Sequence, residues 1–95
     1  MTYKIKFRTD ALKEWNHLDK SIQQQFAKKL KACAENPHIP SAKLRGMPDC
    51  YKIKLRASGF GLVYQVINDE LIIAVVAVGK REHSQVYNLA SKRLR

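Results

Sequence analysis

Apolar and cationic residues alternate strictly along two stretches of the chain, residues 3–8 and residues 51–56. Successive side chains of a β-strand point to opposite faces, so this period predicts two strands with one buried and one basic face. The apolar positions of the second stretch are Tyr51, Ile53 and Leu55. Its basic positions are Lys52, Lys54 and Arg56. We therefore expect three cations side by side on one face of a sheet.

Between these two predicted strands, the apolar residues recur at helical spacing instead of alternating. Residues 9–18 predict a short helix, and its apolar side consists of Leu12, Trp15 and Leu18. Ser21 with Gln24 three residues later is a capping-box pattern, which predicts the start of a second helix. The apolar stripe of that helix consists of Ile22, Phe26, Leu30 and Cys33. Pro37 and Pro40 then predict its end and a loop.

The second half of the chain predicts strands followed by a helix. Residues 60–67 predict a third strand and residues 71–78 a fourth, joined by a hairpin at residues 68–70. The fourth contains no polar residue, so we expect it at the centre of the sheet, ended by Gly79. Residues 84–94 predict a closing helix. Its inward positions are expected to be Val86, Leu89, Ala90 and Leu94.

The resulting order is β-α-α-β-β-β-α, in which helices follow helices and strands follow strands. This grouping indicates the α+β class with a mainly antiparallel four-stranded sheet and helices packed on it. Residues 1–95 can bury one hydrophobic core, so we expect a single domain.

The charge of the chain narrows the choice of partner. Lys and Arg number 18 against 8 Asp and Glu, which gives a net charge of +10. Such an excess favours a polyanion: nucleic acid, an acidic protein or an anionic membrane surface. The basic residues lie mostly on predicted strands and loops rather than on a long amphipathic helix, which disfavours the membrane. The longest apolar run, residues 71–78, is far shorter than the roughly 18 residues that cross a bilayer.

Neither the N-terminus nor the cysteines predict export. The first residues alternate instead of forming an apolar block, so no signal peptide is expected and the cytoplasm is the expected location. Cys33 and Cys50 have no spacing typical of a metal site, and free thiols are favoured over a disulfide. We expect no metal and no cofactor.

The three cations of residues 51–56 repel one another. They would stand about 7 Å apart, so each neighbouring pair repels by roughly 0.5–2.5 kcal/mol, depending on the local dielectric. A face that meets only solvent would include acids to relieve that repulsion, and this one has none. The pattern favours an anionic ligand, with a solvated basic face as the alternative.

Two further basic clusters flank this strand in the sequence, residues 43–46 and residues 79–81. The stretches around them are KLRGMPDCYKIKLR at residues 43–56, LVYQV at residues 62–66 and VGKRE at residues 78–82. These stretches closely resemble the RelE toxins of the RelE/ParE superfamily, from bacterial type II toxin–antitoxin systems. The resemblance extends along essentially the whole chain.

The resemblance implies a fold similar to the small microbial ribonucleases and a specific activity. Toxins of this kind enter the A site of the 70S ribosome, beside 16S rRNA, and cut messenger RNA there without a metal. The 2′-OH of the RNA is the nucleophile, so the products carry a 2′,3′-cyclic phosphate and a 5′-hydroxyl. A cognate RelB-type antitoxin would neutralise the toxin, and operator DNA would be contacted only through the antitoxin complex.

The resemblance also assigns roles to residues of this chain. Lys52 is the candidate general base and Lys54 supports the transition-state charge. Arg81 faces the leaving group as acid or electrostatic stabiliser, and Tyr87 stacks on or orients a base. A packing role for Tyr87 stays equally open. Further candidates for RNA binding are Arg45, Lys43, Arg56, Lys80 and His83.

Two positions depart from the pattern of these toxins. Gly61 stands where an arginine is expected beside the scissile phosphate, and losing one such donor typically costs about 10²–10³ in rate. The chain is then either a naturally attenuated relative or one in which a substitution was introduced or selected against toxicity. His83 stands where another basic residue is expected. It has either a part in proton transfer or a place on the surface at a helix start.

Two other functions compete with the nuclease. A non-catalytic module that binds RNA or the ribosome would use the same cations for phosphate contacts only. A toxin remnant that binds antitoxin and acts as corepressor would need no cleavage at all. The lack of a His/Glu acid–base pair favours the first of these when the resemblance is set aside, and Gly61 favours it slightly even with the resemblance.

Overall fold

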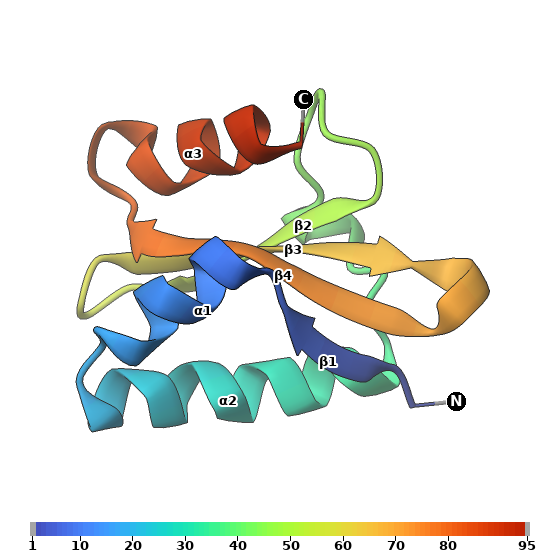
Figure 1. The fold of residues 1–95 in the computed structure, drawn as a ribbon, viewed down its shortest axis with the longest axis horizontal. Helices are drawn as coiled ribbons and strands as arrows, with labels where there is room; N and C mark the ends of the chain where they lie inside the picture. The colour runs from blue at the N-terminus through green and yellow to red at the C-terminus, as the bar shows by residue number, and fades with distance from the viewer. Residues whose placement is uncertain (1, 95) are drawn as a thin grey trace.

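A four-stranded mixed sheet lies between helices in the computed structural model of the chain, which describes residues 2–94 apart from the side chain of His83 (Figure 1). The strands are β1 (Lys4–Phe7), β2 (Cys50–Leu55), β3 (Phe60–Ile67) and β4 (Ile72–Lys80). Their order in the sheet is β1-β4-β3-β2, with β1 parallel to β4 and the other neighbours antiparallel. The α+β class and the order of elements are as the sequence predicts.

Three helices cover the two faces of the sheet. They are α1 (Thr9–Asn16), α2 (Lys20–Glu35) and α3 (Gln85–Arg93). α1 and α2 pack on one face and α3 lies alone on the other, so there are two separate layers of core (Figure 1). The larger core lies under α1 and α2, and the smaller one lies under α3. As expected from its composition, β4 is central, and its residues 75–78 are all buried.

The apolar side of α1 differs from the prediction by one position. Leu12 is 43% exposed, whereas Ala11 is completely buried. Trp15 and Leu18 do pack against the core, as expected. Residues 11, 15 and 18 form one stripe at helical spacing, and Leu12 lies about 100° around the helix from Ala11.

The predicted capping box does not form. α2 begins at Lys20, so Ser21 and Gln24 lie inside the helix, and no side chain caps its first turn. The nearby Gln23 instead donates its amide to the Trp15 carbonyl at 2.8 Å. This bond joins the end of α1 to the start of α2, so a contact between helices takes the place of the expected local one.

Three element boundaries also differ from the expected ones. Gly79 does not end β4, because it pairs with Gly61 of β3 and the strand continues to Lys80. The predicted hairpin between β3 and β4 does form, through a 3₁₀ turn at Asn68–Glu70 followed by Leu71 with a φ of 54°, but β4 starts at Ile72 rather than at residue 71. A 3₁₀ turn at residues 82–84 likewise precedes α3, which starts one residue later than predicted.

An ion pair holds the part of β4 that extends beyond β1. β1 pairs with β4 only as far as Val75. Past that point, the Val76 carbonyl accepts from Arg93 Nη1 at 2.8 Å, and the Val78 N–H donates to Glu14 Oε1 at 3.1 Å. Arg93 also donates to both carboxylate oxygens of Glu14, at 2.8 and 3.1 Å. One bidentate pair therefore connects α1, β4 and α3.

Both cysteines are free, as the sequence predicts, and both are buried. Burial raises the pKa of the Cys50 thiol to about 11, and the Asp49 carboxylate adds to that shift. Burial also raises the pKa of Cys33. Both thiols are therefore protonated at neutral pH. Within residues 2–94, no helix is long and apolar enough to cross a membrane.

Candidate functional site

The strand β2 presents its lysines on the face of the sheet that carries α3. Lys52 lies opposite Val63 and Lys54 opposite Gly61 in the antiparallel register. Val63 belongs to the core under α3, and a Cβ atom at Gly61 would point at Val86 of α3. The alternate residues Tyr51, Ile53 and Leu55 are at most 6% exposed on the other face. The alternation of residues 51–56 therefore separates core from cations as predicted.

Arg81 joins these lysines from the end of β4. Its backbone N–H donates to the Gly59 carbonyl at 2.9 Å, which closes the turn between β2 and β3 against the end of β4. Its guanidinium Nη2 donates to the Leu55 carbonyl at 3.4 Å, at the end of β2. Its Nε is buried without a hydrogen-bond partner among the described residues. Arg81 thus crosses β3 to reach the strand that carries the two lysines.

Tyr87 completes the group from the first turn of α3. It is half-buried and packs against the core under α3. Burial raises the pKa of its hydroxyl, and the charge of Arg81 acts in the opposite direction. The phenol is therefore protonated at neutral pH and close enough to Arg81 to respond to its charge. The structure leaves both stacking and packing open for this ring.

Arg56 and the two lysines of β2 line a cavity of about 390 Å³ at the free edge of the sheet. Lys29 of α2 lines the same cavity, on the side opposite to α3. Sequence reasoning missed Lys29. The sequence did contain a signal for it: Lys29 precedes Cys33 of the apolar stripe by four residues, and residues four apart share a helix face. The cavity has an apolar floor and no acidic lining. Its apolar lining consists of Ala32, Cys33, Ile39 and Ile53.

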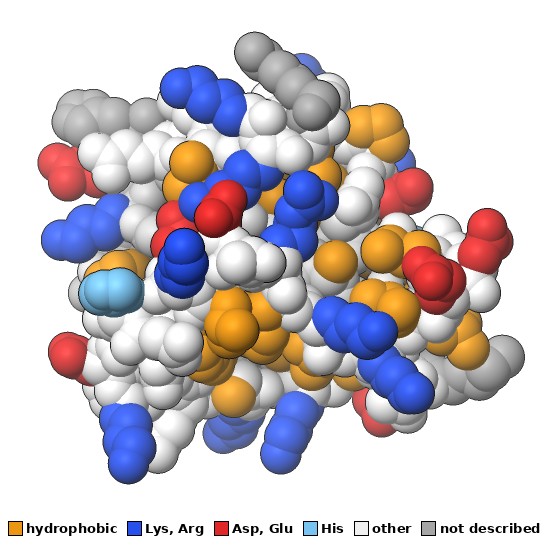
Figure 2. Space-filling model, viewed as in Figure 1, with side chains coloured by type: hydrophobic (Ala, Val, Ile, Leu, Met, Phe, Trp, Pro, Cys, Tyr) orange, Lys and Arg blue, Asp and Glu red, His pale blue; other side chains and the backbone are white. Residues whose placement is uncertain are grey.

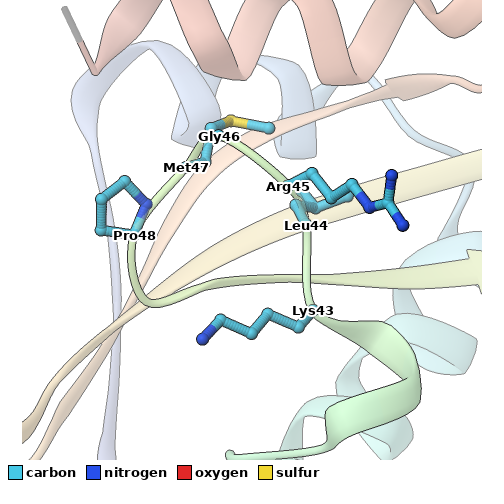
Figure 3. Close-up of a pocket in the computed structure, with 6 residues that line it drawn as sticks. All are labelled: Lys43, Leu44, Arg45, Gly46, Met47 and Pro48. Atoms are coloured by element: carbon cyan, nitrogen blue, oxygen red, sulfur yellow. The ribbon is translucent and has the colours of Figure 1, made fainter.

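Lys43 and Arg45 lie on a loop that surrounds a second cavity, of about 490 Å³. Figure 3 shows their side chains pointing to opposite sides of this loop. The loop is tied to β2 because the Leu44 N–H donates to the Cys50 carbonyl at 2.9 Å. Leu44 and Met47 pack against the core under α3. The structure thus brings the loop to the α3 side of the sheet but does not bring its two cations together.

One predicted RNA-binding residue lies away from this group. Lys80 lies opposite Phe60, whose ring belongs to the core under α1 and α2, and its ammonium is 5.9 Å from that ring. Successive side chains of β4 point to opposite faces of the sheet, so Lys80 lies on the face opposite to that of Lys52. The side chain of His83 lies outside the described residues. Within the described part of the chain, no group of three His, Cys, Asp or Glu residues could hold a metal.

The group defined by Lys52, Lys54, Arg81 and Tyr87 is called the basic site below. Its side chains offer cations and one phenol, which together suit a phosphodiester that gains negative charge. The opposite side of the molecule is different in character: Figure 2 shows Lys and Arg side chains scattered over α1 and β1, with Asp and Glu among them. By contrast, no acidic residue lines the cavity beside the basic site.

Comparisons with known proteins match all or most of the chain. The profile of a family described as "ParE toxin of type II toxin-antitoxin system, parDE" matches residues 5–85. A RelE-like toxin protein of Escherichia coli is 79% identical over 100% of both chains. The mRNA interferase toxin RelE of E. coli K12 is 53% identical over 99% of both. The structure of a free variant of E. coli toxin RelE superposes with a TM-score of 0.92, at 52% identity and full coverage of both chains.

Proposed function

The chain belongs to the RelE/ParE superfamily of type II toxins, and on that premise we propose that it is a ribosome-dependent endoribonuclease. In this proposal it cuts messenger RNA in the ribosomal A site and so inhibits translation. The observation that carries the proposal is that β2, the end of β4 and the start of α3 bring the residues of the basic site to one face of the sheet. The 53% identity to a relative named mRNA interferase supports it.

The proposed reaction uses the RNA's own 2′-OH and no metal. Lys52 takes the 2′ proton while the oxygen attacks phosphorus. Lys54 stabilises the negative charge that develops on the phosphate oxygens. The P–O5′ bond then breaks, and Arg81 either transfers a proton to the leaving oxygen or stabilises it while water supplies the proton. The products are a 2′,3′-cyclic phosphate and a 5′-hydroxyl, so atoms and charge balance without a cofactor.

The partners in this proposal follow from the relatives and the charge. E. coli RelE has been solved in an intact complex with its antitoxin RelB, and we propose a RelB-type antitoxin for this chain. An acidic surface on such a partner would offset the net charge of +10. The 70S ribosome, with its 16S rRNA, and the messenger supply the polyanion during cleavage. Translating ribosomes place the action in the cytoplasm, with operator DNA contacted only through the antitoxin complex.

Primer extension on an mRNA that is being translated in a purified system tests the proposed function. The chain and its Gly61→Arg variant are compared side by side. We expect cuts within A-site codons from the variant and weaker cuts at the same positions from the parent. The missing donor at position 61 is expected to cost about 10²–10³ in rate. Equal cutting by both would end the attenuation hypothesis, whereas no cutting by either would reject the nuclease.

A binding module without catalysis is the second candidate function. Gly61 favours it, because the strand position next to Lys54 carries no side chain at all. A corepressor that binds antitoxin is a third possibility, for the same reason. Retained binding to ribosomes or antitoxin, with no cuts from either form of position 61, would select these candidates over the nuclease.

Lys29 extends the proposed RNA contact around the edge of β2. It shares a cavity with Lys52, Lys54 and Arg56, so a phosphate of the RNA strand can meet it beyond the basic site. We expect Lys29→Gln to weaken binding of a short single-stranded RNA and to reduce the slope of log affinity against log salt by about 0.7. Salt titrations by fluorescence anisotropy measure both quantities.

The matched control for Lys29 is Lys31→Gln. Lys31 is also an exposed lysine of α2 but does not line the cavity. Net charge changes equally in the two variants, so a general electrostatic effect would lower both slopes alike. Equal slopes for both variants would contradict a contact at Lys29.

A further inference from the structure

Arg81 occupies the space that a side chain at position 61 would need. A Cβ atom at Gly61 would lie 2.7 Å from Arg81 Cγ and 3.2 Å from Arg81 Cδ. Carbon atoms without a bond between them prefer about 3.5–4.0 Å, so alanine and the present position of the arginine exclude each other. The stem of Arg81 lies directly on the backbone of β3, and only glycine permits this.

The position of the stem decides where the guanidinium points. Nη2 is directed to the Leu55 carbonyl, at the long distance of 3.4 Å. Nε is buried, and no described residue accepts its hydrogen. A buried donor without an acceptor is unfavourable, and such groups are rare in native proteins. Nε and Nη2, which together could bind a phosphate in bidentate fashion, therefore both point toward the protein.

The close approach is particular to Gly61. Gly79 lies directly opposite it on β4 and faces the same helix. A Cβ atom there would have Val86 Cβ as its neighbour at 3.9 Å, which is ordinary van der Waals contact. Close packing of α3 on the sheet does not by itself require glycine on this face. The constraint at position 61 comes mainly from Arg81, with Val86 Cγ1 at 3.3 Å as a smaller one.

We propose that Gly61 is a positioning residue that keeps Arg81 retracted on β3, and that any side chain at position 61 moves its guanidinium out toward an anion bound at Lys52 and Lys54. The inference deepens the proposed function, because the anion would be the scissile phosphate. With glycine at position 61, the site then lacks two cations. One is the arginine expected at position 61, and the other is the guanidinium of Arg81, which lies over Gly61.

Alanine at position 61 distinguishes this account from simple loss of charge. Alanine adds no donor, so an account based only on the missing arginine predicts no gain. Displacement of Arg81, however, requires only a Cβ atom. We therefore expect Gly61→Ala to strengthen binding of inorganic phosphate by roughly tenfold, the effect of one additional charge-assisted hydrogen bond. Gly61→Ser carries the same Cβ and is the second variant if alanine disturbs α3.

Two NMR measurements test the inference without ribosomes. The first is hydrogen exchange of the Arg81 Nε–H, assigned by its loss in Arg81→Lys. The second is titration with inorganic phosphate. In Gly61→Ala and Gly61→Ser we expect Nε exchange to be about tenfold faster, as for a group that leaves a buried site, together with tighter phosphate binding. Gly79→Ala, the matched control on the same face, should change neither quantity.

Unchanged exchange and unchanged binding in both position-61 variants would overturn the inference. So would weaker phosphate binding, because Arg81 would then serve the site best from its place on Gly61. An equal response in Gly79→Ala would assign the effect to α3 rather than to Arg81. Failure of the proposed function is separate: it would show as absence of mRNA cleavage by every form, whatever the exchange and phosphate data are.

Discussion

Lys52→Met is expected to lower the rate of mRNA cleavage by about 10²–10⁴, the usual contribution of a general base. Lys52 is partly buried on β2, opposite Val63, and its stem lies beside the core under α3. Methionine keeps most of this packing and removes only the amine. The loss should therefore appear in the chemical step rather than in folding.

Single-turnover primer extension with ribosomes in excess measures this step, and ribosome affinity is measured in parallel. We expect affinity to fall by less than about tenfold, because one cation contributes little to a large basic interface. Lys31→Met, at an exposed position of α2, is the control for loss of one charge. The Lys52→Met substitution is introduced into the parent chain or into Gly61→Arg, whichever cleaves mRNA more strongly. A loss of rate that equals the loss of affinity would make Lys52 a binding residue only.

Glu14→Ala is expected to lower the free energy of unfolding by about 2–4 kcal/mol, the range for breaking a mostly buried, hydrogen-bonded ion pair. The Arg93 side chain is only 15% exposed and that of Glu14 26% exposed. Alanine would leave Arg93 without its counter-charge and the Val78 N–H without its acceptor. The cost of these unpaired buried groups dominates the expected loss.

Urea denaturation measures the change, with an unchanged slope against denaturant as the sign that both states keep their compactness. Asp10→Asn is the matched control, since its carboxylate lies 3.9 Å from Arg93 Nε and is 65% exposed. Exposed pairs contribute at most about 1 kcal/mol, so the control should change little. Similar small effects from Glu14→Ala and Asp10→Asn would show that the pair does not hold α3 to the sheet.

The elements of this fold follow from periodicity where the pattern is long, and depend on packing where it is short. The six alternating residues 51–56 and the apolar run of β4 specify their burial without help from the rest of the chain. The start of α2 and the inward side of α1 were predicted wrongly. At the start of α2, a contact between helices, from Gln23 to the Trp15 carbonyl, takes priority over a local signal worth about 1 kcal/mol. In α1, the core takes Ala11 rather than Leu12.

The composition of the basic site was predictable to a similar degree. Lys52 and Lys54 share a face because a strand has a period of two. The same period along β4 places Lys80 on the opposite face of the sheet. The sequence could not show this, because it predicted that β4 ends before Lys80. Lys29 comes from a different element, 23 positions before Lys52 in the chain, and no local pattern links the two.

The sequence by itself determined the superfamily, the order of elements and the cationic face of β2, because each depends on residues that are close in the chain. Only the tertiary structure decided where Arg81 lies. In the sequence, Gly61 shows only that an expected arginine is absent. In the structure, the side chain of Arg81 fills the space above Gly61. Side chains fill the space around them, and which neighbour reaches a gap depends on strand register and the path of the backbone after β4.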